Sequence, residues 1–227
     1  MSDLEIEALK LSLQVALAAV GFSLPIAILV AWVLARKTFP GKSFLDGFVH
    51  LPLILPPVVV GYVLLVGLGR NGIVGSFLFD TFGLTFAFTW KGAAVAAAVM
   101  AFPLMVRAIR LSLESVDQGL EQAARTLGAN PLRVFATVTL PLASPGILTG
   151  AILGFARSLG EFGATITFVS NIPGETRTLP IALYTLTQIP GGEAGAFRLV
   201  VISVIVAFAA LLVSEMMARR LKSRLGG

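Results

Sequence analysis

The sequence has no cysteine and a single histidine, His50, among its 227 residues. Disulfides and metal sites built from thiolates or from several histidines are therefore excluded. Charge is also scarce: Asp, Glu, Lys and Arg make up 13% of the chain, whereas a soluble domain has about 25%. A water-facing surface of this size would need far more charged side chains. With 56% hydrophobic residues, the chain is better suited to lipid than to water.

Long apolar stretches predict membrane-spanning helices, which need about 20 mostly apolar residues each to cross the bilayer core. The runs 93–100 and 200–213 are apolar on every side, unlike the alternating strands of a membrane barrel. We therefore predict an all-α membrane protein with about five transmembrane helices in one domain, residues 1–227. The predicted spans are residues 11–35, 49–69, 92–109, 144–169 and 199–218.

Positive charge is distributed unevenly between the two predicted sides. The loops after the first and third spans and the C-terminal tail hold 11 of the 17 Lys and Arg side chains. Because cytoplasmic loops are enriched in these residues, we predict the N-terminus outside and the C-terminus inside. The same enrichment accounts for the net charge of +5, so nucleic acid is not an expected partner. On the outer side, residues 178–189 are apolar enough to form a short half-embedded helix.

The cytoplasmic loop between the third and fourth spans, residues 110–141, is patterned as ordered structure. Apolar residues recur at helical spacing from Leu113 to Leu127, and Gly128 then stops the run as a helix C-cap. Residues 132–140 form a second short helical segment, which Pro141 is expected to close. Two amphipathic helices on this side predict a docking surface for another protein. The alternative is that they lie on the lipid headgroups.

The spacing within this loop resembles the EAA motif of prokaryotic ABC importer permeases. Gln122-Ala123-Ala124 is followed after three residues by Gly128, and after nine more by Val138 and then Leu140-Pro141. The family usually has Glu where this chain has Gln122, and here a carboxylate, Glu121, comes one residue earlier at a different helical angle. In the family this loop is the coupling helix, which inserts into a groove of a cytoplasmic ATPase. The docking residues implied by the resemblance are Glu121, Gln122, Ala123, Ala124, Gly128, Arg133 and Pro141.

Four further segments are similar to the molybdate, tungstate and sulfate permease family, and most similar to its bacterial molybdate members: residues 35–42, 51–62, 158–165 and 171–178. The resemblance implies a multi-pass subunit of the bacterial inner membrane that imports an oxyanion by alternating access, with molybdate expected and sulfate or tungstate as alternatives. It also implies a second permease copy, a cytoplasmic ATPase dimer and an extracytoplasmic oxyanion-binding protein as partners.

No Gly-x-x-x-x-Gly-Lys-[Ser/Thr] phosphate loop occurs in the sequence. Residues 67–72 spell Gly-x-Gly-x-x-Gly but follow a span instead of a strand, so a dinucleotide site is not expected there. We expect this chain to be a transport subunit and not an enzyme, with ATP and Mg²⁺ bound by the partner ATPase. A secondary transporter would show internal repeats, and a membrane hydrolase would show a nucleophile with its base or metal ligands; the sequence offers neither pattern.

One pair of opposite charges lies well inside a predicted span. Arg157 and Glu161 are four residues apart, on one face of a helix. A lone charge in that place costs about 2.5–3.5 kcal/mol, so the two are expected to neutralise each other. Arg157 could attract the anion, or the pair could brace the fold or a dimer contact. We favour the second role, the brace interpretation, because a carboxylate on the translocation path would repel a dianionic substrate.

The positions of the prolines suggest which segments line the translocation path of the anion. Pro52, Pro56, Pro57 and Pro103 are expected to interrupt their helices, and backbone N–H groups at helix ends hold oxyanions well. The alternative is kinked packing without contact to the substrate. Candidate residues of the translocation path are Pro56, Pro57, Arg157, Ser158, Glu161, Thr165 and Thr167.

Overall fold

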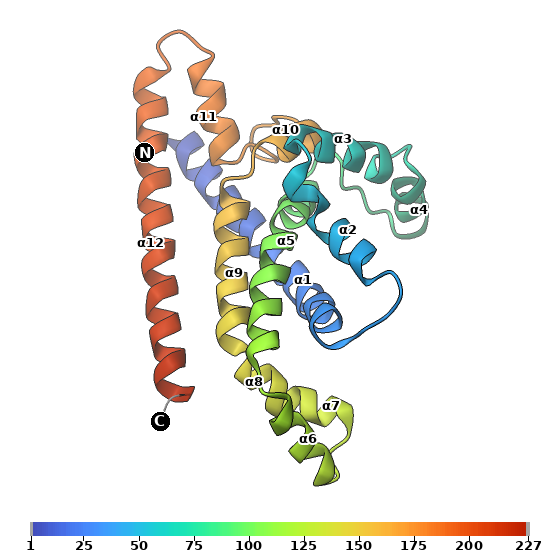
Figure 1. Cartoon of the computed structure of the whole chain (residues 1–227). Helices are drawn as coiled ribbons and strands as arrows, with labels where there is room; N and C mark the ends of the chain where they lie inside the picture. Colours follow the sequence, from blue (N-terminus) through green and yellow to red (C-terminus); the bar gives the residue numbers. More distant parts are fainter. Residues whose placement is uncertain (1, 226–227) are drawn as a thin grey trace.

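The computed structural model describes residues 2–225, and all regular elements in that range are helical, which confirms the predicted fold class. Figure 1 shows α5 and α9 side by side, with α1 crossing them, α3 and α4 extending as an arm and α6 and α7 at one end of the molecule. The helices are α1 (Asp3–Arg36), α2 (Lys42–Ile54), α3 (Pro57–Leu68), α4 (Ile73–Phe82), α5 (Trp90–Ser115), α6 (Gln118–Thr126), α7 (Pro131–Val134), the π-helix η1 (Phe135–Thr139), α8 (Leu140–Leu142), α9 (Ser144–Leu159), α10 (Gly163–Val169), α11 (Leu179–Thr187) and α12 (Glu193–Leu225).

Within the described residues, three helices are long and apolar enough to cross a membrane, and up to five spans result if each bent pair counts as one. The three are α1, α5 and the first part of α12. The prediction of one continuous helix over residues 49–69 is wrong, because α2 and α3 meet at an angle of 113°. The break falls at Leu55 and Pro56, where two successive prolines remove backbone donors and disfavour helical geometry in the residue before them.

The predicted span 144–169 is also divided. Helix α9 ends at Leu159 and α10 begins at Gly163, with Gly160 as the C-cap of α9. Glycine has low helix propensity, which favours an end at this point. By contrast, Pro52 and Pro103 lie inside α2 and α5, which continue through them, so the expected interruptions there are wrong. Membrane helices tolerate such prolines when neighbours satisfy the freed backbone groups.

Small side chains allow the central helices to approach closely. Helix α5 packs most extensively against α1 and α9, and Gly146, Gly150 and Gly154 of α9 face it at intervals of four residues. A Cβ atom on Gly150 would lie 3.0 Å from Cγ1 of Ile109 and 3.1 Å from the carbonyl oxygen of Met105. Spacing of this kind is typical of membrane helix pairs, whose association depends on van der Waals packing.

Two polar contacts join the beginning of the chain to its last helices. Arg198 of α12 donates from Nε to Oε1 of Glu5 on α1 at 2.8 Å, and the backbone N–H of Leu179 donates to Oγ of Ser12 at 2.7 Å. The predicted short helix in residues 178–189 is confirmed as α11. It forms a hairpin with α12, so α1, α11 and α12 are tied together at one end of the molecule.

Candidate functional site

The α5–α9 connection, residues 116–143, is a compact unit of short helices at one end of the molecule (Figure 1). The prediction of one helix from Leu113 to Leu127 is wrong, because α5 continues to Ser115 and α6 starts afresh at Gln118. Asp117 separates the two by capping α6, with Oδ1 accepting from the backbone N–H of Gly119 at 2.7 Å.

Gly128 ends α6 as predicted. Its φ angle is +87°, a left-handed conformation that favours glycine, and its N–H donates to the Arg125 carbonyl at 3.0 Å. The N–H of Ala129 reaches back to the Ala124 carbonyl at 3.1 Å, which completes a Schellman motif. The turn that separates the two short helical segments is therefore fixed by the backbone.

The second segment differs from its prediction at its end. Pro141 does not close it, since Pro141 lies inside α8 and the chain bends by 68° only between α8 and α9. A π-helix, Phe135–Thr139, precedes this proline. In an α-helix the proline ring would clash with the carbonyl four residues before it, and a wider turn relieves that clash. Helical turns of the π type often mark functional sites.

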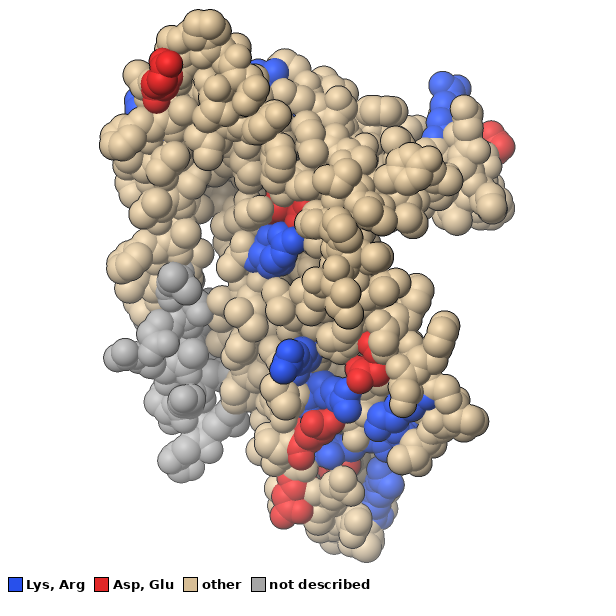
Figure 2. All heavy atoms as spheres, turned by 45° about the horizontal axis from the view of Figure 1, so that its top comes forward, with Lys and Arg blue, Asp and Glu red and all other residues tan. Residues whose placement is uncertain are grey.

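The tip of the connection exposes apolar side chains. Leu127 is 88% exposed and Leu132 is 76% exposed, although charged side chains gather at this end of the molecule (Figure 2). Leu120 is also exposed, at 49%, so the tip carries several apolar side chains whose burial in a contact would be stabilising. Ala124 is half-buried. The predicted docking residues that lie exposed are Gln122, Ala123, Gly128, Arg133 and Pro141.

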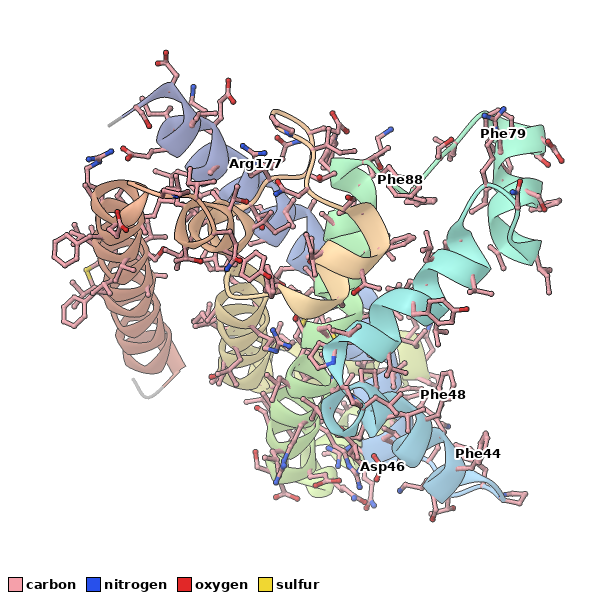
Figure 3. The ribbon with its side chains drawn as sticks, turned by 90° about the horizontal axis from the view of Figure 1, so that it is seen from above. Phe44, Asp46, Phe48, Phe79, Phe88 and Arg177 are labelled. Carbon is pink, nitrogen blue, oxygen red and sulfur yellow. The ribbon has the colours of Figure 1, made fainter. Side chains whose placement is uncertain are left out.

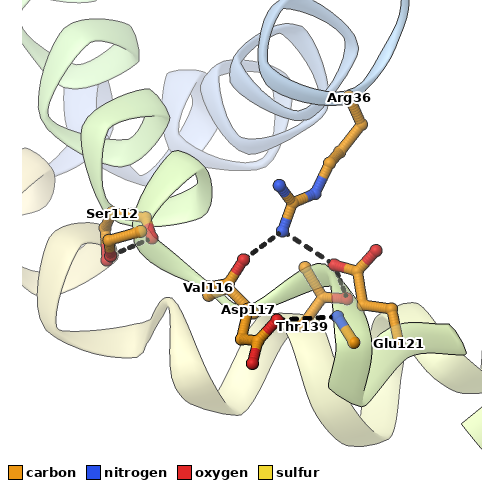
Figure 4. A network of polar contacts seen from close by, with 8 residues as sticks. Arg36, Ser112, Val116, Asp117, Glu121 and Thr139 are labelled. Atoms are coloured by element: carbon orange, nitrogen blue, oxygen red, sulfur yellow. Dashed lines mark hydrogen bonds and ion pairs between the residues drawn. The ribbon is translucent and has the colours of Figure 1, made fainter. Parts of the chain in front are cut away.

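Glu121 differs from these neighbours, because it is buried inside the connection. Its Oε1 accepts from Nη2 of Arg36 at 2.9 Å and from Oγ1 of Thr139, also at 2.9 Å (Figure 4). Successive residues of a helix point about 100° apart, so Glu121 and Gln122 face different surroundings. The structure thus turns Gln122 outward and Glu121 inward. From the sequence both residues were predicted to dock the ATPase, because the motif specifies the spacing of residues but not which face of the helix is buried.

The two segments predicted to line the path lie against each other. A Cβ atom on Gly163 of α10 would be 2.7 Å from Cβ of Pro57, and one on Gly61 of α3 would be 2.5 Å from the Ala164 carbonyl oxygen. Pro56 and Pro57 are exposed at the start of α3. The two glycines therefore allow α3 and α10 to touch backbone to backbone.

The hydroxyl groups predicted for the path have different surroundings. Thr165 is only 1% exposed, and Thr167 donates its hydroxyl to the Gly163 carbonyl at 2.9 Å within its own helix. Ser158 is buried, and its Oγ has no hydrogen-bond partner within the described part of the chain. Ser158 is therefore a buried hydroxyl with unused bonding capacity.

Arg157 and Glu161 form the predicted ion pair, with Nη1 and Oε2 2.6 Å apart. The pair does not lie along one helix face, because Glu161 falls beyond the end of α9 at Leu159. Glu161 is buried and its Oε1 also accepts from the backbone N–H of Ala164 at 2.8 Å, which holds the start of α10. The Arg157 side chain is 27% exposed. The carboxylate thus joins the end of α9 to α10 across the break, as the brace interpretation requires.

This geometry predicts that Arg157→Ala destabilises the chain and that adding Glu161→Gln restores most of the loss. The single change leaves a buried carboxylate without its cation, which should cost about 3 kcal/mol, the lower end for a broken buried pair, because Ala164 remains a donor. In the double variant a neutral amide oxygen still accepts from Ala164. Thermal unfolding of the solubilised protein and ion uptake together give the measurement. We expect uptake to return with stability. If stability returns alone, Arg157 also acts on the anion; if Arg157→Ala leaves the unfolding temperature unchanged, the brace interpretation is wrong.

A cavity lies at the end of the molecule opposite to α6 and α7. It has a volume of about 220 Å³ and is lined by Glu7 and Lys10 of α1 and by Arg177 of the loop before α11. Arg177 also donates from Nε to Oδ1 of Asn171 at 2.7 Å. Figure 3 views this end and also shows Phe44 and Phe48 of α2 pointing away from the bundle. Both phenylalanines are exposed, as lipid-facing residues are.

Comparison with known proteins places this arrangement among transport proteins. Residues 8–224 match the family described as "Binding-protein-dependent transport system inner membrane component". The molybdenum transport system permease protein ModB of Escherichia coli (strain K12) is 65% identical over 226 residues, which covers 100% of this chain and 99% of that protein. The sulfate transport system permease protein CysT of Salmonella typhimurium is 39% identical over 183 residues, covering 81% of this chain and 66% of that protein.

A solved structure has the same fold at lower sequence identity. The bacterial alginate ABC transporter in complex with an alginate pentasaccharide-bound periplasmic protein aligns with a TM-score of 0.77 and 20% identity. The alignment covers 97% of this chain and 80% of the matched chain.

Proposed function

Because this chain belongs to the family of inner membrane components of binding-protein-dependent transport systems, we propose that it is the membrane-spanning subunit of an ABC importer for molybdate. The observation that carries the substrate is the 65% identity over the whole chain to a molybdenum permease. Identity to the sulfate permease is 39% over a shorter stretch, so sulfate is the second candidate.

The importer needs further subunits, and we propose that residues 1–227 act as a single permease domain within it. A second copy of this chain, two ATPases and an extracytoplasmic binding protein complete the complex. The ATPases bind ATP and Mg²⁺. In the proposed orientation α6 and α7 face the cytoplasm, the N-terminus lies outside and the C-terminus inside. The charged end in Figure 2 supports this orientation, because cytoplasmic segments are rich in Lys and Arg.

The docking surface is the exposed part of the α5–α9 connection. We assign the contact with the ATPase to Gln122, Ala123, Ala124 and the turn at Gly128, with Arg133 and Pro141 beside it. The exposed Leu127 supports this assignment, because a leucine that is 88% exposed gains by being covered. The connection lies between α5 and α9 in the chain, so its displacement acts on both helices.

Alternating access then follows from two conformations of the ATPase dimer that bind the connection differently. A partner shifts a conformational equilibrium only by its difference in affinity for the two states. We place the path along the junction of α3 with α10, beside the break after α9. These segments carry the path candidates Pro56, Pro57, Thr165 and Thr167, and Ser158 lies near the break with a hydroxyl that has no hydrogen-bond partner within the described residues. The Arg157–Glu161 pair joins the two sides of the break.

Reconstitution tests the function directly. The chain, its ATPase and the binding protein are placed in liposomes, and uptake of labelled molybdate is followed with and without ATP. We expect uptake that needs ATP and the ATPase subunit, stops with vanadate and is reduced more by unlabelled tungstate than by sulfate. Uptake that follows an ion gradient without the ATPase would contradict the importer, and stronger competition by sulfate would contradict the molybdate assignment.

A further inference from the structure

A buried ion pair connects the last residue of α1 with the docking helix. Nη2 of Arg36 and Oε1 of Glu121 are 2.9 Å apart, and the two side chains are only 9% and 11% exposed (Figure 4). Ion pairs on the surface contribute little because water screens them. A pair buried to this degree is costly to form unless its remaining polar atoms are also satisfied. Most of the available hydrogen bonds are made, but Nε of Arg36 is buried without a partner within the described residues.

Further hydrogen bonds connect the same pair to two other segments. Glu121 Oε1 also accepts from the hydroxyl of Thr139 in η1, which is 2% exposed. Arg36 Nη2 donates in addition to the carbonyl oxygen of Val116 at 3.1 Å, at the junction of α5 and α6. We call these four residues, Arg36, Val116, Glu121 and Thr139, the latch. We call the α5–α9 connection, residues 116–143, the docking unit. The latch joins the beginning and the end of this unit to the C-terminal end of α1.

Apart from the latch, the docking unit is joined to the bundle by two bends and by an aromatic contact, in which the rings of Phe135 in η1 and Trp32 in α1 have centroids 5.8 Å apart. One is the break between α5 and α6 at residues 116–117, and the other is the 68° bend between α8 and α9. The extensive packing of α6 is with η1 and α7 inside the same unit, and not with α1. Apolar contacts are non-directional and do not fix the angle of the unit, so without the polar latch part of the movement of a bound partner would be absorbed at the bends.

We infer that Glu121 is a positioning residue that makes the docking unit rigid with respect to α1, so that movement of the ATPase reaches the membrane helices. This inference rests on the proposed function. It separates the roles of two adjacent residues: Gln122 is exposed to the ATPase, whereas Glu121 keeps the helix that carries Gln122 at a fixed angle. Loss of Glu121 should therefore leave docking intact and uncouple ATP hydrolysis from transport.

The first test compares Glu121→Gln with Glu114→Gln in the complete reconstituted complex. Glu114 is a matched control, because it also accepts from an arginine, Arg110, but is 42% exposed and lies outside the latch. We expect Glu121→Gln to retain the ATPase subunit and its basal hydrolysis, and to transport about tenfold fewer molybdate ions per ATP. A hydrogen bond to a charged group contributes more than the free energy of a tenfold change. Glu114→Gln should match the wild type.

The second test restores the latch by other means. The exchange variant R36E/E121R should recover at least part of the transport per ATP that R36E and E121R each lose. Because the sequence has no cysteine, R36C/E121C can also be bridged with a short bismaleimide before the ATPase is added. Bridging should raise transport per ATP in the variant and leave the cysteine-free chain unchanged.

Two results would overturn the inference. Transport per ATP equal to that of the wild type in Glu121→Gln would show that the latch transmits nothing. Loss of ATPase binding in a folded Glu121→Gln variant, judged by its unfolding temperature, would make Glu121 a docking residue. A wild-type complex without ATP-driven uptake would instead contradict the proposed function, so the two failures are distinguishable.

Discussion

Replacing Leu127 with glutamate should remove the ATPase from the purified complex without unfolding the membrane subunit. Leu127 is 88% exposed next to the turn at Gly128, so the substitution disturbs little inside the chain. In the proposed complex the ATPase would cover this position, and a carboxylate there would be desolvated without a partner. Central interface residues of this kind contribute about 2–4 kcal/mol, enough to weaken binding at least 30-fold.

The measurement is the amount of ATPase retained on affinity-purified membrane subunit, with the unfolding temperature recorded for both forms. Leu127→Met is the matched control, because it conserves volume and apolar character. We expect Leu127→Met to retain the ATPase. Full retention by Leu127→Glu would show that the exposed tip is not the docking surface and would favour its lying on lipid headgroups.

The second large effect is expected at Gly61, where α3 meets α10. A Cβ atom there would lie 2.5 Å from the Ala164 carbonyl oxygen and 2.9 Å from Ala164 Cα. Both atoms belong to the backbone, so they cannot turn aside as a flexible side chain would. Gly61→Ala must therefore separate the two helices, at a cost of about 1–3 kcal/mol for overpacking. We expect a lower unfolding temperature and a loss of uptake, because the separated helices adjoin the proposed path.

Gly67→Ala provides the control within the same helix. A Cβ atom on Gly67 would meet nothing within 4 Å, and alanine is about 1 kcal/mol more favourable than glycine inside a helix. Gly67→Ala should therefore be neutral or slightly stabilising. Equal unfolding temperatures and uptake for the two variants would contradict the close approach of α3 and α10.

The sequence was sufficient to predict features that depend on local pattern. The apolar runs predicted α1, α5 and α12, because twenty apolar residues have few alternatives to a membrane helix. Gly128 was predicted as a helix end from its position after a periodic segment, and its φ angle of +87° confirms it. The family expected from the EAA-like spacing is confirmed by the match over residues 8–224.

Breaks inside apolar runs were harder to predict, because hydropathy does not register them. The run that contains α2 and α3 is apolar throughout, yet the chain turns by 113° at Pro56. Prolines alone were a poor guide, since Pro52 and Pro103 lie inside continuous helices. Helix α4, Ile73–Phe82, was missed because ten residues are too few for a span and its surroundings resemble a loop. Whether a proline bends a helix depends on the tertiary contacts around it, which a single sequence does not specify.

The ion pairs between distant segments had no signal in the sequence. Arg36 and Glu121 are 85 residues apart, and no periodicity relates them. The sequence placed Glu121 in the docking motif, but it could not show that the carboxylate would be covered. Burial of a single charged residue in a short helix is decided by which segment packs on it, and here that segment is the end of α1.

The contact between Glu5 and Arg198 has a consequence for how the chain is made. The two residues are separated by 193 positions, and translation proceeds from the N-terminus at about 5–20 residues per second. Glu5 therefore gains its partner only when nearly the whole polypeptide has left the ribosome. Joining of the first helix to the last is therefore a late step of membrane assembly, and a prematurely terminated product would carry Glu5 without its arginine.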